Sequence, residues 1–185
     1  MLKEPRAGRV KTRLGRDIGM VGAAWWFRHQ TRALIQRLDD PRWRLVLAVS
    51  PDRQGVQSRV WPAHLPRLAQ GRGSLGDRMK RVFKVLPPGP VAIIGADIPG
   101  VTPAHIAGAF AALGRSDAVI GPVPDGGYWL IGLRRTRAVP AELFLGVRWS
   151  GPNARSDTVA SLGALSVAVT ATLADVDTVA DLRRT

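Results

Sequence analysis

Three aspartates stand where strands are expected to end, and their type and spacing suit a divalent cation. Asp97 follows an apolar run in Gly95-Ala-Asp-Ile-Pro-Gly100, and Asp175 and Asp177 follow another in Asp175-Val-Asp-Thr178. Two carboxylates one residue apart in an extended chain point the same way. Carboxylates at neighbouring strand ends can hold a hard cation that bridges nucleotide phosphates, so the pattern indicates a site for Mg²⁺ or Mn²⁺. Two alternatives stay open: Asp177 or Thr178 could cap a helix, and Asp97 could form a turn.

A basic loop near the start of the chain, Arg6-Ala-Gly-Arg-Val-Lys-Thr-Arg-Leu14, contains the groups that hold a phosphate. Gly8 and the backbone N–H groups at the start of a following helix allow an anion to approach closely. Lys11 and Arg13 add whole positive charges, and Thr12 adds a hydroxyl. We expect the loop to bind nucleotide phosphates, with a solvated basic loop as the alternative, since the sequence is not a Walker A motif.

A third candidate is Asp125-Gly-Gly-Tyr128, which lies between two apolar runs. Glycines after an aspartate form turns between strands, and this explanation needs no ligand. Asp125, Gly126, Gly127 and the adjoining Tyr128 could equally line a substrate pocket. The residues alone leave both interpretations open.

The elements that would position these residues follow from periodicity and from helix and strand boundaries. We expect helices over residues 20–38, 74–86, 103–113, 153–162 and 178–182, and strands over residues 44–50, 91–95, 118–120, 128–133 and 165–173. Residues 51–73 read mostly as loop. Strands that alternate with helices predict a mostly parallel sheet with helices on both faces, and such sheets bind ligands beyond the carboxyl ends of their strands.

Composition narrows the class of protein. The 185 residues suit a single domain over 1–185, and 45% hydrophobic residues are ordinary for a globular chain. No apolar run is long enough to span a membrane, the first residues lack the apolar region of a secretory signal, and cysteine is absent. We therefore expect a cytoplasmic protein that makes no disulfides and does not bind a membrane.

The net charge is +13, and 23 of the 27 basic residues are arginines scattered along the chain. One explanation of the many arginines is arginine-rich codon usage. Another is that the positive charge creates an electrostatic field that attracts phosphorylated small molecules. We do not expect a dedicated nucleic-acid-binding protein, because no groove-reading motif accompanies the charge. The sequence leaves a homodimer open.

Five motifs, taken in order, resemble a known group of enzymes. They are Pro5-Arg-Ala-Gly-Arg-Val-Lys-Thr-Arg-Leu14, Gly73-Ser-Leu-Gly-Asp-Arg-Met79, Gly95-Ala-Asp-Ile-Pro99, Asp125-Gly-Gly-Tyr-Trp-Leu-Ile-Gly-Leu133 and Asp175-Val-Asp-Thr178. This set is similar to the bacterial GT-A-like transferases called radical-SAM/selenodomain-associated transferases or arsenosugar-biosynthesis glycosyltransferases. It is more distantly similar to molybdenum cofactor guanylyltransferase and phospholactate guanylyltransferase. The resemblance implies a three-layer α/β/α GT-A fold over nearly the whole chain.

The same resemblance implies roles for individual residues. Gly8, Lys11 and Arg13 would receive the nucleotide phosphates, with Lys11 and Arg13 assisting the reaction. Asp97 would be the acidic metal ligand after the central strand, and Asp177 the second, with Asp175 close by. Asp125 to Tyr128 would line the acceptor side, and Trp149 would be a further substrate-binding residue. Trp149-Ser150 falls where the family tends to have Trp-Ser-Thr, but Gly151 replaces the threonine here.

Two reactions fit the resemblance, and both use a nucleotide-activated small molecule. The first is metal-dependent glycosyl transfer from a nucleotide-sugar to an unknown acceptor. The second is nucleotidyl transfer, which releases pyrophosphate. A catalytically idle nucleotide- or nucleic-acid-binding protein is the alternative outside enzymology.

The start of the chain departs from the family's pattern. The family usually carries an apolar first strand before the Pro-Arg-Ala-Gly-like loop, whereas this chain begins at Met1-Leu2. Either the natural start lies upstream, or the chain is truncated, or the sheet lacks that strand. A missing buried strand would leave backbone groups of its neighbours unpaired.

Overall fold

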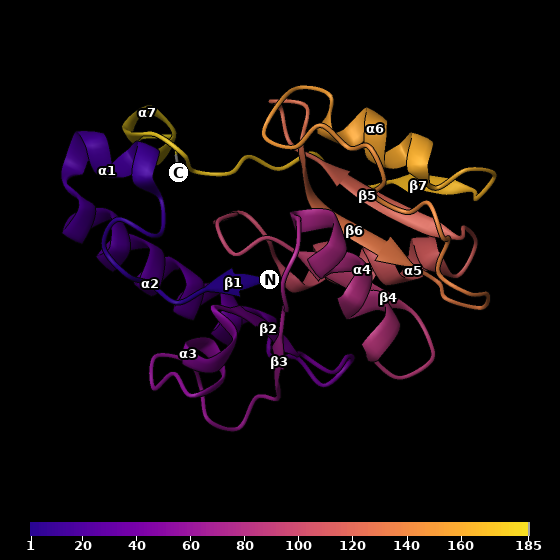
Figure 1. Ribbon diagram of the computed structural model, residues 1–185, viewed down its shortest axis with the longest axis horizontal. Helices are drawn as coiled ribbons and strands as arrows, with labels where there is room; N and C mark the ends of the chain where they lie inside the picture. Colours follow the sequence, from indigo (N-terminus) through magenta and orange to yellow (C-terminus); the bar gives the residue numbers. More distant parts are fainter. Residues whose placement is uncertain (185) are drawn as a thin grey trace. The chain divides into compact units, whose positions relative to one another are not determined.

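The computed structural model describes residues 1–184 (Figure 1). The chain forms two compact units. Unit 1 comprises residues 1–69, 95–103 and 174–185, of which Thr185 lies outside the described residues, and unit 2 comprises residues 70–94 and 104–173. The expectation of one domain over residues 1–185 stays a prediction.

Unit 1 contains a fully parallel three-stranded sheet. Its strands are β1 (Leu2–Lys3), β2 (Leu47–Ser50) and β3 (Arg67–Ala69), in the order β1-β2-β3. Leu2 pairs with Val49, and Ala48 pairs with Leu68. A strand does therefore precede the basic loop, and it is two residues long.

Four helices accompany this sheet, and they are α1 (Thr12–Ile18), α2 (Met20–Leu38), α3 (Asp52–Val56) and α7 (Val179–Leu182). The bounds of α2 confirm the periodicity prediction, and its buried face, which includes Phe27 and Ile35, packs in one core with Leu47 and Val49 of β2. The prediction of mostly loop over residues 51–73 was wrong for α3 and β3. Both elements are too short to show a helical or a strand period.

Unit 2 contains a four-stranded mixed sheet in the order β4-β6-β5-β7. Its strands are β4 (Val91–Ile94), β5 (Ala118–Pro122), β6 (Tyr128–Leu133) and β7 (Val167–Val169). β6 runs antiparallel to β4 and β5, whereas β5 and β7 are parallel. The expected mostly parallel sheet is thus interrupted by β6, because only residues 123–127 join β5 to β6, and so short a connection closes a hairpin.

Three helices belong largely to unit 2, namely α4 (Leu75–Val85), α5 (Pro103–Leu113) and α6 (Ala154–Ser161). The predicted capping box is present at α4, where the hydroxyl of Ser74 accepts from the backbone N–H of Asp77 and the Asp77 carboxylate accepts from Ser74. Leu113 of α5 packs against Gly132 of β6.

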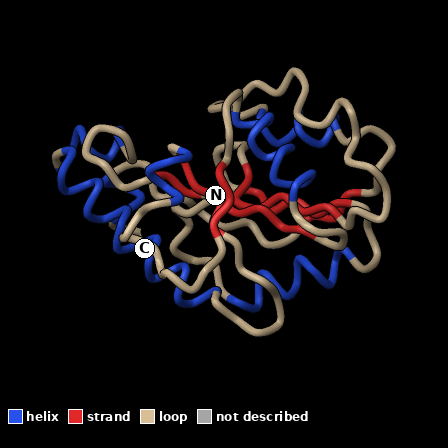
Figure 2. The backbone as a smooth tube through the Cα atoms, turned by 60° about the horizontal axis from the view of Figure 1, so that its bottom comes forward, coloured by secondary structure: helices blue, strands red, loops and turns tan. Residues whose placement is uncertain are grey.

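Residues 134–153 contain neither helix nor strand and are drawn as loop in Figure 2. No helix among residues 1–184 is long and apolar enough to cross a membrane. The predicted α/β class is confirmed.

Candidate active site

The three aspartates predicted to share a cation do converge. One carboxylate oxygen from each of Asp97, Asp175 and Asp177 lies within 4.8 Å of the other two, and all three residues are half-buried in unit 1. Asp97 comes three residues after β4, and the other two precede α7. The side chains thus come from segments almost eighty residues apart in sequence and meet at one place.

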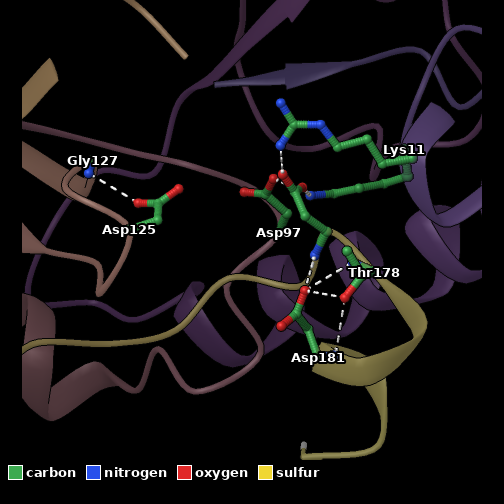
Figure 3. A network of polar contacts seen from close by, with 8 residues as sticks. Lys11, Asp97, Asp125, Gly127, Thr178 and Asp181 are labelled. Atoms are coloured by element: carbon green, nitrogen blue, oxygen red, sulfur yellow. Dashed lines mark hydrogen bonds and ion pairs between the residues drawn. The ribbon is translucent and has the colours of Figure 1, made fainter. Parts of the chain in front are cut away.

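Lys11 from the basic loop joins this cluster. Its Nζ lies 2.5 Å from Oδ2 of Asp97 and 2.6 Å from Oδ1 of Asp177, and only 7% of its side chain is exposed (Figure 3). Burial by itself lowers the pKa of Lys11, but the charges and hydrogen bonds of Asp97 and Asp177 outweigh burial and raise the pKa above its usual value. The ammonium is therefore charged at neutral pH.

Arg13 adds a second cation at the edge of the cluster. Its Nη1 lies 3.1 Å from Oδ2 of Asp177, while 64% of its side chain is exposed. Asp177 therefore binds Lys11 with one oxygen and Arg13 with the other. Because Arg13 is exposed, its guanidinium can turn to an anionic ligand at little energetic cost.

Of the other residues predicted to bind phosphate in this loop, Gly8 and Thr12 are open to solvent, whereas Val10 between them is buried. Gly8 has a φ of 72° in a turn closed by the N–H of Arg9, which donates to the carbonyl of Arg6 at 3.0 Å. Thr12 is the exposed first residue of α1. Lys11 precedes it in a left-handed conformation, with φ 45° and ψ 48°. Such a backbone strains a residue with a side chain, and strain of this kind clusters at functional sites.

The aspartate pair before α7 is fixed by a capping box rather than by a strand. β7 ends at Val169, so the predicted strand over 165–173 is shorter than expected and does not carry Asp175 directly. Instead the hydroxyl of Thr178 accepts from the N–H of Asp181, and the carboxylate of Asp181 accepts from the N–H groups of Thr178 and Asp177 (Figure 3). The carboxylate of Asp177 therefore remains available for Lys11 and Arg13.

Backbone contacts hold the two acidic segments together. The side chain of Val176 is fully buried, and its N–H donates to the carbonyl of Asp97 at 3.2 Å. Since Val176 lies between the two aspartates, its burial and this hydrogen bond fix the segment that carries both carboxylates next to the Asp97 turn.

The turn that carries Asp97 is also held by α2, which the sequence did not indicate. The buried hydroxyl of Thr31 donates to the carbonyl of Ala96 at 3.4 Å, and Nη2 of Arg37 donates to the carbonyl of Pro99 at 2.8 Å. The one signal in the sequence for this contact is that Thr31 is a polar residue on the otherwise apolar face of α2. A Cβ added at Gly95 would lie 2.9 Å from Oδ1 of Asp97, so a side chain at this position would displace that carboxylate.

The donor set fits a hard divalent cation. All three ligand groups are carboxylate oxygens, which Mg²⁺ and Mn²⁺ prefer. The cluster already attracts a cation, because it holds the ammonium of Lys11 between two of its members. Asp97, Asp175 and Asp177 would be the ligands.

The third candidate, Asp125 to Tyr128, belongs to unit 2 and forms the connection between β5 and β6. Oδ1 of Asp125 accepts from the N–H of Gly127 at 2.9 Å. Gly126 has a φ of 89°, and a Cβ there would overlap the backbone of Pro152. The turn interpretation therefore holds for the backbone, and Asp125 itself stays exposed.

Two predicted aromatic residues of unit 2 have packing roles. The hydroxyl of Tyr128 accepts from the buried hydroxyl of Thr158 at 3.2 Å, and burial raises the pKa of Tyr128, so the phenol stays protonated at neutral pH. Trp149 is half-buried, with its ring centroid 6.0 Å from that of Phe144, and it borders Gly76 of the Gly73–Met79 motif. Contact of these residues with an acceptor stays a prediction.

Residues 33–151 match the sequence profile of the family described as "Uncharacterized protein conserved in bacteria (DUF2064)". The match covers well over half of the chain. The chain belongs to this DUF2064 family. No curated protein matches the sequence.

A crystal structure from Desulfovibrio desulfuricans G20 resembles this DUF2064 protein over 98% of the present chain and 81% of its own, with 32% sequence identity and a TM-score of 0.86. That protein carries the provisional name of a nucleotide-diphospho-sugar transferase. The likeness confirms the expected GT-A-like fold.

Two mycobacterial structures share this fold at lower similarity. Rv0371c from Mycobacterium tuberculosis H37Rv has 18% identity and a TM-score of 0.54, with 85% of the present chain and 81% of its own covered. Its homologue from Mycobacterium sp. strain JC1 has 18% identity and a TM-score of 0.56, with 85% and 80% covered.

Proposed function

We propose that this DUF2064 protein is a transferase that uses a nucleotide-sugar and a divalent ion, Mg²⁺ or Mn²⁺, and moves the glycosyl group to an acceptor. The observation that carries the proposal is the meeting of Asp97, Asp175 and Asp177 with Lys11 of the basic loop. The provisional name of the Desulfovibrio relative supports the choice of a nucleotide-diphospho-sugar as donor.

Glycosyl transfer breaks the bond between the anomeric carbon of the sugar and an oxygen of the diphosphate. The electron pair leaves with the diphosphate, and the acceptor forms the new bond to carbon and loses its proton. A divalent ion held by the three aspartates would offset negative charge on the leaving group. Lys11 and Arg13 would bind the phosphate oxygens and stabilise the charge that develops there.

The acidic cluster accounts for the donor substrate but not for the acceptor. Lys11, Arg13 and an ion held by the aspartates would bind the nucleotide diphosphate, while the resemblance assigns the acceptor to Asp125–Tyr128. Burial raises the pKa of Tyr128 and keeps its phenol protonated at neutral pH, whereas Asp125 carries an exposed carboxylate that would accept the proton of the acceptor. Asp125 is therefore the residue to test on the acceptor side.

Product analysis tests the proposal. The purified protein is incubated with Mn²⁺ and UDP-, GDP- or CDP-sugars, and separately with the matching nucleoside triphosphates and sugar phosphates. Release of a nucleoside diphosphate that depends on Mn²⁺ supports glycosyl transfer, with water as the slow acceptor. Release of pyrophosphate supports nucleotidyl transfer instead. Binding of none of these nucleotides, with or without Mn²⁺, contradicts both.

A further inference from the structure

The ammonium of Lys11 occupies the part of the acidic cluster that a metal ion would use. Its two contacts, with Asp97 and Asp177, are to two of the three carboxylates that form the candidate metal site. The side chain is almost fully buried, so the ammonium is not a loosely held surface charge. Lys11 also belongs to the loop proposed to bind phosphate, which gives it two possible partners.

A divalent ion and this ammonium exclude one another. An ion bound to Asp97 and Asp177 would lie about 2 Å from their oxygens, and those oxygens now lie 2.5 Å and 2.6 Å from Nζ. Two cations so close together repel strongly at a partly buried site.

We infer that Lys11 is an internal counter-ion that a divalent ion must displace, and that the displaced ammonium then binds the diphosphate of the donor. The inference rests on the proposed function and adds the sequence of binding events at the site. A divalent ion on its own binds poorly because it competes with the ammonium of Lys11 for the carboxylates. An ion that arrives with a nucleotide diphosphate brings an anion that can bind the displaced ammonium. Ion and nucleotide therefore increase each other's affinity.

Titration with Mn²⁺ alone tests the competition without any knowledge of the donor. Binding to the wild type and to Lys11→Met is followed by the electron paramagnetic resonance signal of free Mn²⁺. We expect Lys11→Met to bind Mn²⁺ about tenfold more tightly, within the usual range for coupled sites. Lys3→Met is the matched control, because it removes the same charge from an exposed side chain of unit 1, and its affinity should equal that of the wild type.

The second part of the titration adds UDP, GDP or CDP. In the wild type the preferred nucleotide should increase the affinity for Mn²⁺ about tenfold. In Lys11→Met this increase should be largely lost, because the variant has no ammonium that moves from the carboxylates to the diphosphate. Equal Mn²⁺ affinity of the wild type and Lys11→Met, together with an intact gain from nucleotide, overturns the inference and leaves the proposed function standing. Absence of Mn²⁺ binding by every variant, with and without nucleotide, overturns both.

A measurement on the wild type covers the case in which Lys11→Met fails to fold. Lysine acetylation by an amine-reactive ester is measured by mass spectrometry, with exposed Lys3 as the internal reference. Saturating Mn²⁺ should raise the labelling of Lys11 relative to Lys3 severalfold, because the ammonium leaves its carboxylates. Addition of the preferred nucleotide diphosphate should lower the labelling again. Labelling of Lys11 that does not change with Mn²⁺ contradicts displacement.

Discussion

The ammonium of Lys11 lies 2.5 Å from the carboxylate of Asp97, although 86 positions separate the two residues in the sequence. This contact joins the basic loop to the turn after β4. It brings the group proposed to bind phosphate and the group proposed to bind a metal ion into one cluster.

Replacement of Asp97 by asparagine should abolish metal-dependent nucleotide binding while the fold stays intact. The change removes one of three ligand carboxylates and one of two partners of Lys11. Calorimetric titration with UDP, GDP and CDP, with and without Mn²⁺, measures the loss. Asp39→Asn removes the same charge from an exposed position of unit 1 and should bind like the wild type. Unchanged binding by Asp97→Asn would refute the site.

Loss of the capping box at α7 should weaken the metal site without removing a ligand. Thr178→Ala frees the N–H of Asp181 and should cost about 1 kcal/mol of local stability, so that Asp177 is held less firmly. We expect weaker Mn²⁺ binding in the presence of nucleotide. Ser74→Ala is the matched control, because it removes the corresponding capping box of α4 in unit 2. If both variants lose Mn²⁺ affinity equally, the effect is general and not due to Asp177.

Because the backbone at Lys11 is left-handed, we expect glycine and alanine at this position to differ in their effect on the free energy of unfolding. Glycine adopts a φ of 45° without the steric penalty that a Cβ brings, which is about 1 kcal/mol. Lys11→Gly and Lys11→Ala remove the same ion pairs, so the glycine variant should be the more stable by about this amount. Urea unfolding of the two variants gives the difference. A more stable alanine variant would show that the conformation is not strained.

Asp157 makes the fold of unit 2 sensitive to acid. Hydrogen bonds from the side chain and the backbone of Arg148 lower the pKa of Asp157 to about 2, below its usual value of 3.8. Because the folded-state pKa is depressed, the ionised carboxylate stabilises the folded state above about pH 4, and this contribution is lost as the pH falls toward 2. The Tm difference between the wild type and Asp157→Asn should therefore shrink over that range. A difference that does not vary with pH would contradict the assignment.

The sequence predicted that the three aspartates meet, and they do, although Asp175 and Asp177 do not directly follow a strand as expected. Asp175 and Asp177 flank a single residue, Val176, which is buried. The position of Lys11 among them could not be predicted, because its left-handed conformation, which is most often found at glycine or asparagine, leaves no signal at a lysine.

The direction of β6 was predictable in principle. Asp125-Gly-Gly between two apolar runs is typical of a hairpin, and a hairpin makes β6 antiparallel to β5, as observed. The short elements β1 and α3 carry too few residues for any periodic pattern, so only tertiary pairing defines them.

Unit 1 is assembled from three stretches of chain that are far apart in sequence, and each stretch brings one part of the acidic cluster: Lys11, then Asp97, then Asp175 with Asp177. A continuous fragment must therefore span at least residues 11–177 to contain the complete cluster. Closing such long loops is slow compared with forming local helices. The return of Mn²⁺ affinity during refolding would consequently mark the moment at which the longest-range contacts of the chain have formed, later than the return of helical signal.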